Sequence, residues 1–177
     1  IYYEHCSYFT PGSLARLFRH EGLDPISLRL GYDDQYILLD ARPGDGRSPT
    51  LDLESDLNET ARLVEHFQHQ YRDHVRVLRS MVDGATSRKG RIVIWGGGSK
   101  GVSFLTTLAI EDEIEYAVDI NPYKQGKFMA GTGQEVVAPR FLVDYRPDLV
   151  IAMNSIYREE IGQELDRMGL SPELVTV

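Results

Sequence analysis

The strongest constraint on the fold is a run of apolar residues that leads directly into a cluster of glycines. Residues 91–95 read as a short buried strand, and the sequence GGGSKG follows at once. From there to the end of the sequence, apolar stretches typical of strands alternate with stretches of helical periodicity. Such alternation is typical of a parallel sheet whose strands are joined by helices that cover both of its faces. We therefore expect residues 91–177 to form an α/β domain.

The apolar pattern predicts five strands, which cover residues 91–95, 115–119, 134–138, 148–153 and 173–177. It predicts helices over residues 99–110, 140–145 and 157–168, the first with Phe104, Leu105 and Leu108 facing inward. The fourth strand is apolar almost throughout, which suits a strand buried on both faces. The predicted fold class is a Rossmann-like, mainly parallel five-stranded sheet with flanking helices.

The upstream part of the chain has a different pattern. Ser13 is a candidate N-cap for a helix over residues 13–21, which Gly22 ends. Two strand-like runs, residues 25–32 and 35–42, predict a hairpin, and the composition of residues 43–50 indicates a linker. A long amphipathic helix is expected over residues 57–82, with one apolar stripe made of Val64, Phe67, Tyr71, Val75, Leu78 and Val82.

Histidines on this long helix are the one candidate metal site. His66 and His69 are three residues apart, so they could share a metal ion, but no third ligand is evident. The favoured interpretation is that they belong to a solvated polar face, and no metal is expected.

The glycine cluster has the chemistry of a phosphate-binding loop. Gly96, Gly98 and Gly101 match the spacing G-x-G-x-x-G, in which the glycines allow a tight turn, a close approach to phosphate and close packing of the helix. The N-terminus of the following helix offers free N–H groups and partial positive charge, and Ser99 and Lys100 lie in its first turn. The alternative interpretation is that this loop is only a turn.

Three further residues are candidate ligands of the same molecule. Asp119 and Asn154 follow predicted strands, and ligands of such sheets gather beyond the carboxyl ends of the strands. Asp119 follows Gly98 by about 20 residues, the spacing of a ribose-binding acid. Lys124 adds positive charge in a glycine-rich loop that could contact the phosphates or sugar of a nucleotide, or could be a solvated loop.

Composition excludes several classes of partner. The 177-residue chain carries a net charge of −8, which argues against binding to nucleic acid or to an anionic membrane surface. It has no apolar run of the roughly 18 residues that a membrane span requires. Cys6 is the only cysteine, so the chain forms no internal disulfide, and we expect a cytoplasmic location.

Four stretches resemble one family, the sugar C-methyltransferases that act on nucleotide-linked keto-deoxysugars. The sequence IYYEHCSYFTPGSLARLFRHEGL resembles the end of that family's catalytic domain. The sequences VIWGGGSKGVSFL, YAVDINPYKQGKFMAGTGQEVVAP and PDLVIAMNSIY resemble its C-terminal domain. The resemblance covers nearly the whole chain and implies the C-terminal part of a methyltransferase that uses S-adenosylmethionine.

The resemblance also implies where the reaction takes place. Members combine an N-terminal zinc-binding region, a central S-adenosylmethionine domain and a C-terminal Rossmann-like domain that helps to anchor the nucleotide-linked sugar. S-adenosylmethionine and zinc are therefore expected in upstream parts of a longer protein, and neither is expected here. The family's Y-x-E-H motif matches Tyr2, Glu4 and His5. His5 is then the candidate base that removes a proton beside the sugar ketone, with Tyr2 and Glu4 in support.

This interpretation divides the chain into three parts. Residues 1–45 are the remnant of the catalytic domain, 46–90 are a linker with the long helix, and 91–177 are the Rossmann-like domain. The piece by itself is expected to be inactive. Two alternatives remain open: an NAD-type or other nucleotide-binding regulatory module, which Asp119 would favour, and an interaction module that forms a homodimer through residues 57–82.

Overall fold

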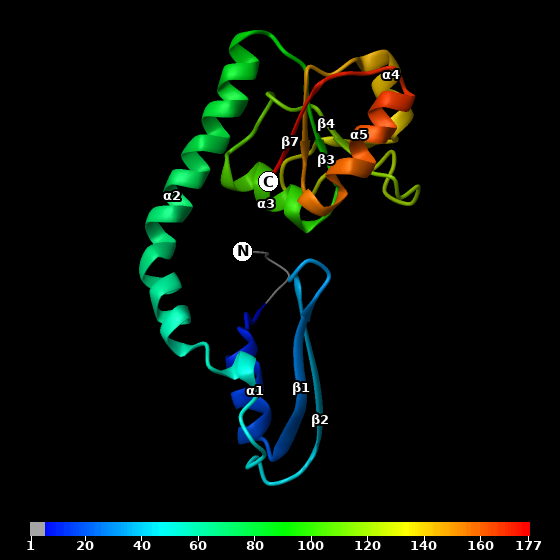
Figure 1. Ribbon diagram of the computed structural model, residues 1–177. Helices are drawn as coiled ribbons and strands as arrows, with labels where there is room; N and C mark the ends of the chain where they lie inside the picture. Colours follow the sequence, from blue (N-terminus) through cyan, green and yellow to red (C-terminus); the bar gives the residue numbers. More distant parts are fainter. Residues whose placement is uncertain (1–5) are drawn as a thin grey trace. The chain divides into compact units, whose positions relative to one another are not determined.

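The structure, a computed structural model, describes residues 6–177 and divides into two compact units. One unit comprises residues 6–71 and the other residues 72–177, so the long helix α2, Leu57–Ser87, begins in the first unit and ends in the second (Figure 1). The predicted three-part division, with boundaries at residues 45 and 90, stays a prediction.

The second unit contains the predicted sheet. Its strands are β3 (Ile92–Trp95), β4 (Tyr116–Val118), β5 (Glu135–Val137), β6 (Leu149–Ala152) and β7 (Glu173–Thr176). They lie in the order β5-β4-β3-β6-β7, and every neighbouring pair is parallel. The fold class predicted from the sequence is thus confirmed, with each strand within two residues of its expected bounds.

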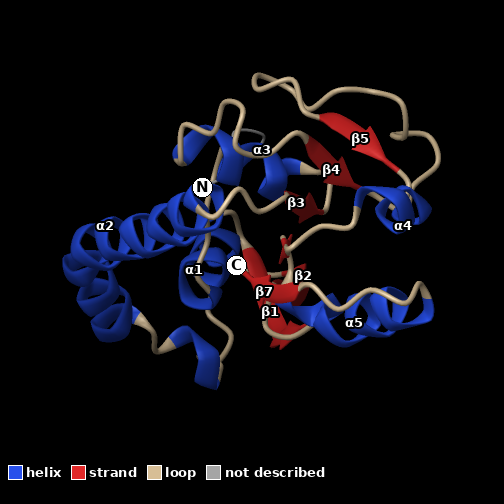
Figure 2. Ribbon diagram, turned by 90° about the horizontal axis from the view of Figure 1, so that it is seen from above, coloured by secondary structure: helices blue, strands red, loops and turns tan. Residues whose placement is uncertain are grey.

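Helices cover both faces of this sheet (Figure 2). The C-terminal half of α2 and α3 (Ser99–Thr107) cover one face, where Phe104, Leu105 and Leu108 are buried as expected. The other face is covered by α4 (Leu142–Tyr145) and α5 (Arg158–Arg167), each preceded by a short 3-10 turn. The central strands β3 and β6 are buried at every residue, because both of their faces are covered.

The strand order places a switch point between β3 and β6. The chain leaves β3 toward one side of the sheet, through α3 to β4, and later returns to the other side of β3 as β6. In sheets of this kind the loops diverge at the carboxyl ends of the two central strands, where ligands bind. The glycine cluster follows β3, and Asn154 follows β6, so both lie at this edge.

The first unit contains the expected helix and hairpin. Helix α1 spans Pro11–His20, and strands β1 (Leu23–Gly31) and β2 (Tyr36–Pro43) form an antiparallel pair. The prediction that Ser13 caps α1 is wrong: Thr10 is the N-cap, and Ser13 closes a reciprocal capping box from the third helical position. The helix begins earlier because proline is favoured in the first turn.

Residues 43–50, expected to be a linker, are held against α1. The guanidinium of Arg19 donates to the carbonyl oxygens of Ser48 and Pro49, at 2.6 and 2.9 Å. It also forms an ion pair with Glu54, which lies in a 3-10 turn, Asp52–Glu54. Composition cannot reveal such ordering, since it depends on one long side chain from a distant helix.

The apolar stripe of α2 is only partly buried. Val82 is fully buried, and Val75 and Leu78 pack against the sheet core. Val64 and Phe67 are exposed, at 70% and 52%. Only the C-terminal part of the predicted stripe packs on the sheet core, because α2 is longer than the core it covers. At the exposed end, the rings of Phe67 and Tyr71 stack on each other with centroids 5.8 Å apart.

Candidate functional site at the carboxyl ends of the strands

The glycine loop turns sharply between β3 and α3. Gly96 has a φ of +127°, a conformation that strains other residues, and its amide donates to the carbonyl oxygen of Val118 at 2.8 Å. A Cβ atom on Gly96 would lie 3.0 Å from the side chain of Met153, which follows β6. At Gly101 a Cβ atom would lie 2.5 Å from the Gly96 carbonyl oxygen. Two of the three glycines of the predicted pattern are therefore required by close packing.

Asp119 lies at the end of β4 and faces this loop. One carboxylate oxygen accepts hydrogen bonds from the Gly97 amide and from the Lys124 ammonium, both at 3.0 Å. The other oxygen accepts a hydrogen bond from the backbone amide of Asn121 at 2.9 Å. Asp119 is buried, so these three donors compensate for the loss of water around its charge. The carboxylate joins the glycine loop to the segment that follows β4.

Lys124 and the N-terminus of α3 bring positive charge to the same place. A Cβ atom on Gly98 would lie 3.7 Å from Nζ of Lys124. Gly98 is the N-cap of α3, so no capping side chain covers the first amides of the helix, and its first turn contains no acidic residue. The positive end of the helix dipole and one ammonium group therefore lie at the backbone of Gly98.

The other predicted residues lie at the same edge of the sheet. Ser99 and Lys100 are the first two residues of α3, and both are partly buried. Asn154 is the N-cap of the 3-10 turn after β6, and its side chain accepts from the Ile156 amide at 3.4 Å. Within the predicted set, Asp119 is in direct contact with Lys124, and it also binds the glycine loop through Gly97.

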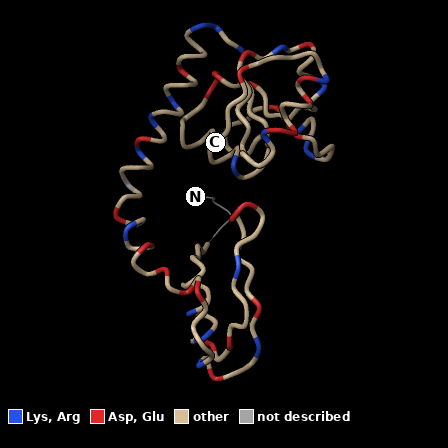
Figure 3. Tube along the Cα trace, in the orientation of Figure 1, with Lys and Arg blue, Asp and Glu red and all other residues tan. Residues whose placement is uncertain are grey.

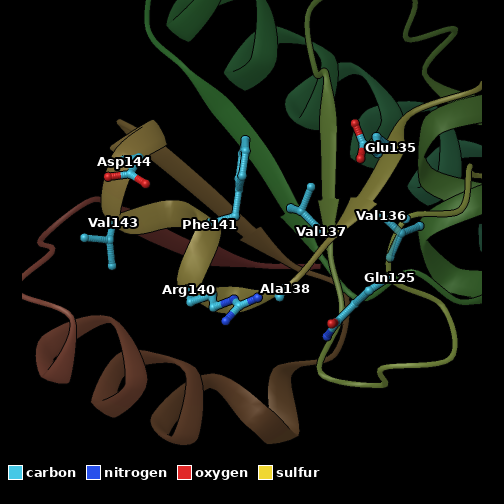
Figure 4. A pocket seen from close by; sticks show the side chains of 10 residues that line it. Gln125, Glu135, Val136, Val137, Ala138, Arg140, Phe141, Val143 and Asp144 are labelled. Carbon is cyan, nitrogen blue, oxygen red and sulfur yellow. The ribbon is translucent and has the colours of Figure 1, made fainter.

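A pocket of about 610 Å³ lies beside the edge strand β5 (Figure 4). Gln125 and Arg140 lie along one rim, and Phe141 lies beside Val137. None of its lining residues belongs to the predicted site. Gln125 connects the pocket to that site, because its side-chain amide donates to the Asp119 carbonyl oxygen at 3.0 Å.

Sequence reasoning missed Gly97 as well as this pocket. The dinucleotide pattern treats the position between the first two glycines as variable, whereas the Gly97 amide is the atom that Asp119 binds. An acid that directly follows a strand next to a glycine loop was the available signal. For the pocket the sequence offered no signal, since its lining combines residues that are ordinary for a strand, a turn and a short helix.

The predicted catalytic residues lie outside the described part of the chain. Tyr2, Glu4 and His5 precede residue 6, so their roles stay predictions. On α2, His66 contacts the carbonyl oxygen of Arg62 through Nδ1 at 2.8 Å. Within residues 6–177 no three His, Cys, Asp or Glu residues gather in a way that could hold a metal ion.

Charged residues of both signs are mixed along the described part of the chain, with Lys and Arg interspersed with Asp and Glu in both units (Figure 3). None of the helices in residues 6–177 combines the length and the apolar character needed to cross a bilayer.

Comparison with known proteins gives a family. The C-methyltransferase C-terminal domain model matches residues 50–171, more than half of the chain. The chain is also 26% identical over 178 aligned positions to the C-methyltransferase NovU of Streptomyces niveus. That alignment covers 91% of this chain but only 41% of the relative, so the chain spans less than half of the relative's length.

Among solved structures, the Rex-family repressor RSP matches with a TM-score of 0.39 and 18% identity, covering 50% of this chain and 52% of the repressor. The same repressor in complex with β-NADH matches with a TM-score of 0.38 and 18% identity, again over 50% of this chain and over 53% of the repressor. These similarities are too low to support an argument about function. The match over residues 50–171 is sufficient by itself: the chain belongs to the C-methyltransferase C-terminal domain family.

Proposed function

We propose that residues 92–177 anchor the nucleotide of a nucleotide-linked keto-deoxysugar for an S-adenosylmethionine-dependent C-methyltransferase. In this proposal the diphosphate binds at the glycine loop, against Gly98 and the N-terminus of α3. Lys124 supplies the full positive charge, and Ser99 and Lys100 lie in the first turn of the same helix. Gly96 and Asn154 border the site at the switch point of the sheet.

One observation carries this proposal: among residues 6–177 other than its chain neighbours, only the ammonium of Lys124 lies within 4 Å of the position that a Cβ atom on Gly98 would take. A phosphate needs backbone N–H donors, positive charge and room for close approach, and all three meet at this glycine. Family membership supports the same assignment, because it makes this region the C-terminal domain of a C-methyltransferase.

The reacting part of the substrate is assigned to the first residues of the chain. We propose that His5 removes the proton from the carbon beside the sugar ketone, and that Tyr2 and Glu4 support it. The resulting enolate carbon would take its methyl group from S-adenosylmethionine, whose S–CH3 bond would break to leave S-adenosylhomocysteine. No described residue is assigned to S-adenosylmethionine or to zinc, so we expect the 177-residue chain alone to transfer no methyl group.

A titration of the 177-residue chain with thymidine diphosphate tests the anchoring role. Trp95 is the only tryptophan and directly precedes Gly96, so its fluorescence reports binding at the loop. We expect saturable binding that the substitution Lys124→Met weakens by about tenfold, the effect of losing one charge-assisted contact. Calorimetry with NAD and with S-adenosylmethionine shows whether the site prefers another nucleotide.

The matched control is Lys89→Met. Lys89 lies just before β3, at the amino ends of the strands, so the same loss of charge there should leave the affinity unchanged. Absence of binding, or equal affinity for thymidine diphosphate in the Lys124→Met variant, would contradict the proposal. Tight binding of NAD alone would instead favour a dinucleotide-binding module.

A further inference from the structure

The position of Asp119 is the one at which dinucleotide-binding sheets carry a ribose-binding acid. Such an acid accepts hydrogen bonds from ribose hydroxyl groups, so its carboxylate oxygens must be available to the ligand. Asp119 occupies that position in this chain, because it directly follows β4 and lies about 20 residues after Gly98. The contacts of its carboxylate decide whether it can play that role.

The carboxylate of Asp119 already accepts hydrogen bonds from three donors of its own chain. Its Oδ2 atom accepts from the Gly97 amide and from Nζ of Lys124, and its Oδ1 atom accepts from the Asn121 amide. The residue is 8% exposed. Three of the roughly four acceptor positions of the carboxylate are therefore filled. A ribose hydroxyl would have to reach the one that is left, on Oδ1 of a residue that is almost completely buried.

The same contacts fix the two groups that meet the proposed diphosphate. The hydrogen bond to Gly97 holds the glycine loop, and the ion pair places the Lys124 ammonium in front of Gly98. A side chain at position 97 would crowd this contact, because a Cβ atom there would lie 3.2 Å from Oδ2 of Asp119. Asp119 therefore links the loop after β3 to the segment after β4.

We propose that Asp119 is a positioning residue and that it does not bind ribose. It holds the glycine loop and Lys124 in the arrangement that receives a diphosphate, so the site does not distinguish ribose from 2′-deoxyribose. The inference rests on the proposed function for the ligand, whereas the bonds that position the loop are independent of any ligand.

A matched pair of nucleotides tests the ligand side. Thymidine diphosphate and 5-methyluridine diphosphate differ only in the 2′-hydroxyl group. The 177-residue chain should bind both with equal affinity, and Asp119→Asn should weaken both by the same factor of about ten, because Lys124 loses its partner. Tighter binding of the ribonucleotide, with a preference that disappears in Asp119→Asn, would overturn the proposal.

Binding of thymidine monophosphate distinguishes a positioning role of Asp119 from a general loss of structure in the variant. If Asp119 acts through Lys124 on the diphosphate, Asp119→Asn should weaken the diphosphate more than the monophosphate. A substitution that merely loosened the fold would weaken both equally, which would also count against the proposal. Asp166→Asn, an exposed carboxylate of α5, is the control for loss of one negative charge.

Hydrogen exchange provides a readout that needs no ligand. The Gly97 amide should exchange about tenfold faster in Asp119→Ala than in the natural chain, because its acceptor is lost. Unchanged exchange would refute the positioning role. If the natural chain bound neither nucleotide, the proposed function would fail, and the exchange result would still decide the role of Asp119. If the variant does not fold, the ratio of the natural chain's affinities for thymidine diphosphate and 5-methyluridine diphosphate still tests the proposal.

Discussion

The two units of this chain are stabilised in different ways. In residues 72–177, apolar side chains fill both faces of a parallel sheet, and every residue of β3 and β6 is buried. In residues 6–71, Ala15 and Pro25 are the described apolar side chains that are fully buried. The hairpin strands β1 and β2 are mostly exposed or half-buried.

In the smaller unit, ion pairs supplement this limited apolar packing. Arg19 pairs with Glu54, whose side chain is 4% exposed, and Arg16 pairs with Asp56. Hydrogen bonds from Arg19 lower the pKa of Glu54, against the opposing effect of burial. These contacts attach the segment after the hairpin to α1.

The contrast follows from how much surface each arrangement can cover. A parallel sheet with helices on both sides hides each central strand completely, whereas one helix against a two-stranded hairpin leaves most side chains in contact with water. A unit of the second kind must rely on directional contacts between polar groups. Three experiments can test this difference between the two units.

Truncation of an apolar side chain should give the largest difference in lost stability between the two units. Ile151→Ala in β6 should lower the free energy of unfolding of the sheet unit by about 3 kcal/mol, because it leaves a cavity in a closed core. Leu38→Ala in β2 removes a side chain that is 38% exposed and should cost less than about 1 kcal/mol. Urea unfolding followed by Trp95 fluorescence and by circular dichroism compares them; equal costs would contradict the difference in packing.

Removal of the Glu54 charge should affect only the smaller unit. Glu54→Gln should cost about 2 kcal/mol at neutral pH, because Arg19 loses its charged partner. The folded-state pKa of Glu54 is below its ordinary 4.5, so its contribution is present above pH 4.5 and is lost as the pH falls through the lowered value. The variant should lack this acid-dependent loss, as measured by hydrogen exchange in α1.

Glu65→Gln is the control for that experiment, since Glu65 is an exposed carboxylate on α2. It should leave the acid dependence of α1 unchanged. Faster exchange in β3 or β6 of the Glu54→Gln variant would show that the ion pair supports both units, contrary to the comparison.

The smallest effect is expected at alkaline pH, in the sheet unit. Burial, followed by the nearby charge of Glu115, raises the pKa of Tyr145 to about 12. The stability linked to this phenol is present below pH 10, the ordinary value, and is lost as the pH rises through about 12. Tyr145→Phe should remove this dependence, a difference of about 1 kcal/mol near pH 10.5.

Trp95 fluorescence during urea unfolding between pH 9 and 11 measures that difference. Tyr123→Phe is the control, because Tyr123 is 83% exposed. An identical alkaline loss of stability in the natural chain and in Tyr145→Phe would show that other groups cause it.

Much of the fold could be predicted because its signals are local. The apolar run of residues 148–153 was enough to predict a strand buried on both faces, and β6 is buried throughout. The hairpin and the start of α2 were also expected close to their bounds. The extent of burial along α2 was not, because periodicity shows which residues share a face but not how far a partner surface extends.

The candidate site was predictable in position but not in contacts. Glycine spacing and strand ends placed Gly98, Asp119 and Asn154 at one edge of the sheet. The sequence did not specify which atoms the carboxylate of Asp119 binds, and it gave no sign of the pocket beside β5. Those features depend on distances between loops that are joined only through the sheet.

The sequence alone was enough to predict that residues 91–177 form a parallel sheet with a glycine turn after its first strand, because apolar periodicity and glycine act over a few neighbouring residues. Only the tertiary structure decided what the groups at that turn contact. The loops after β3 and β4 meet because their strands are adjacent and parallel, and a carboxylate buried between them takes the nearest N–H donors. The partners of Asp119 are therefore a property of the assembled sheet.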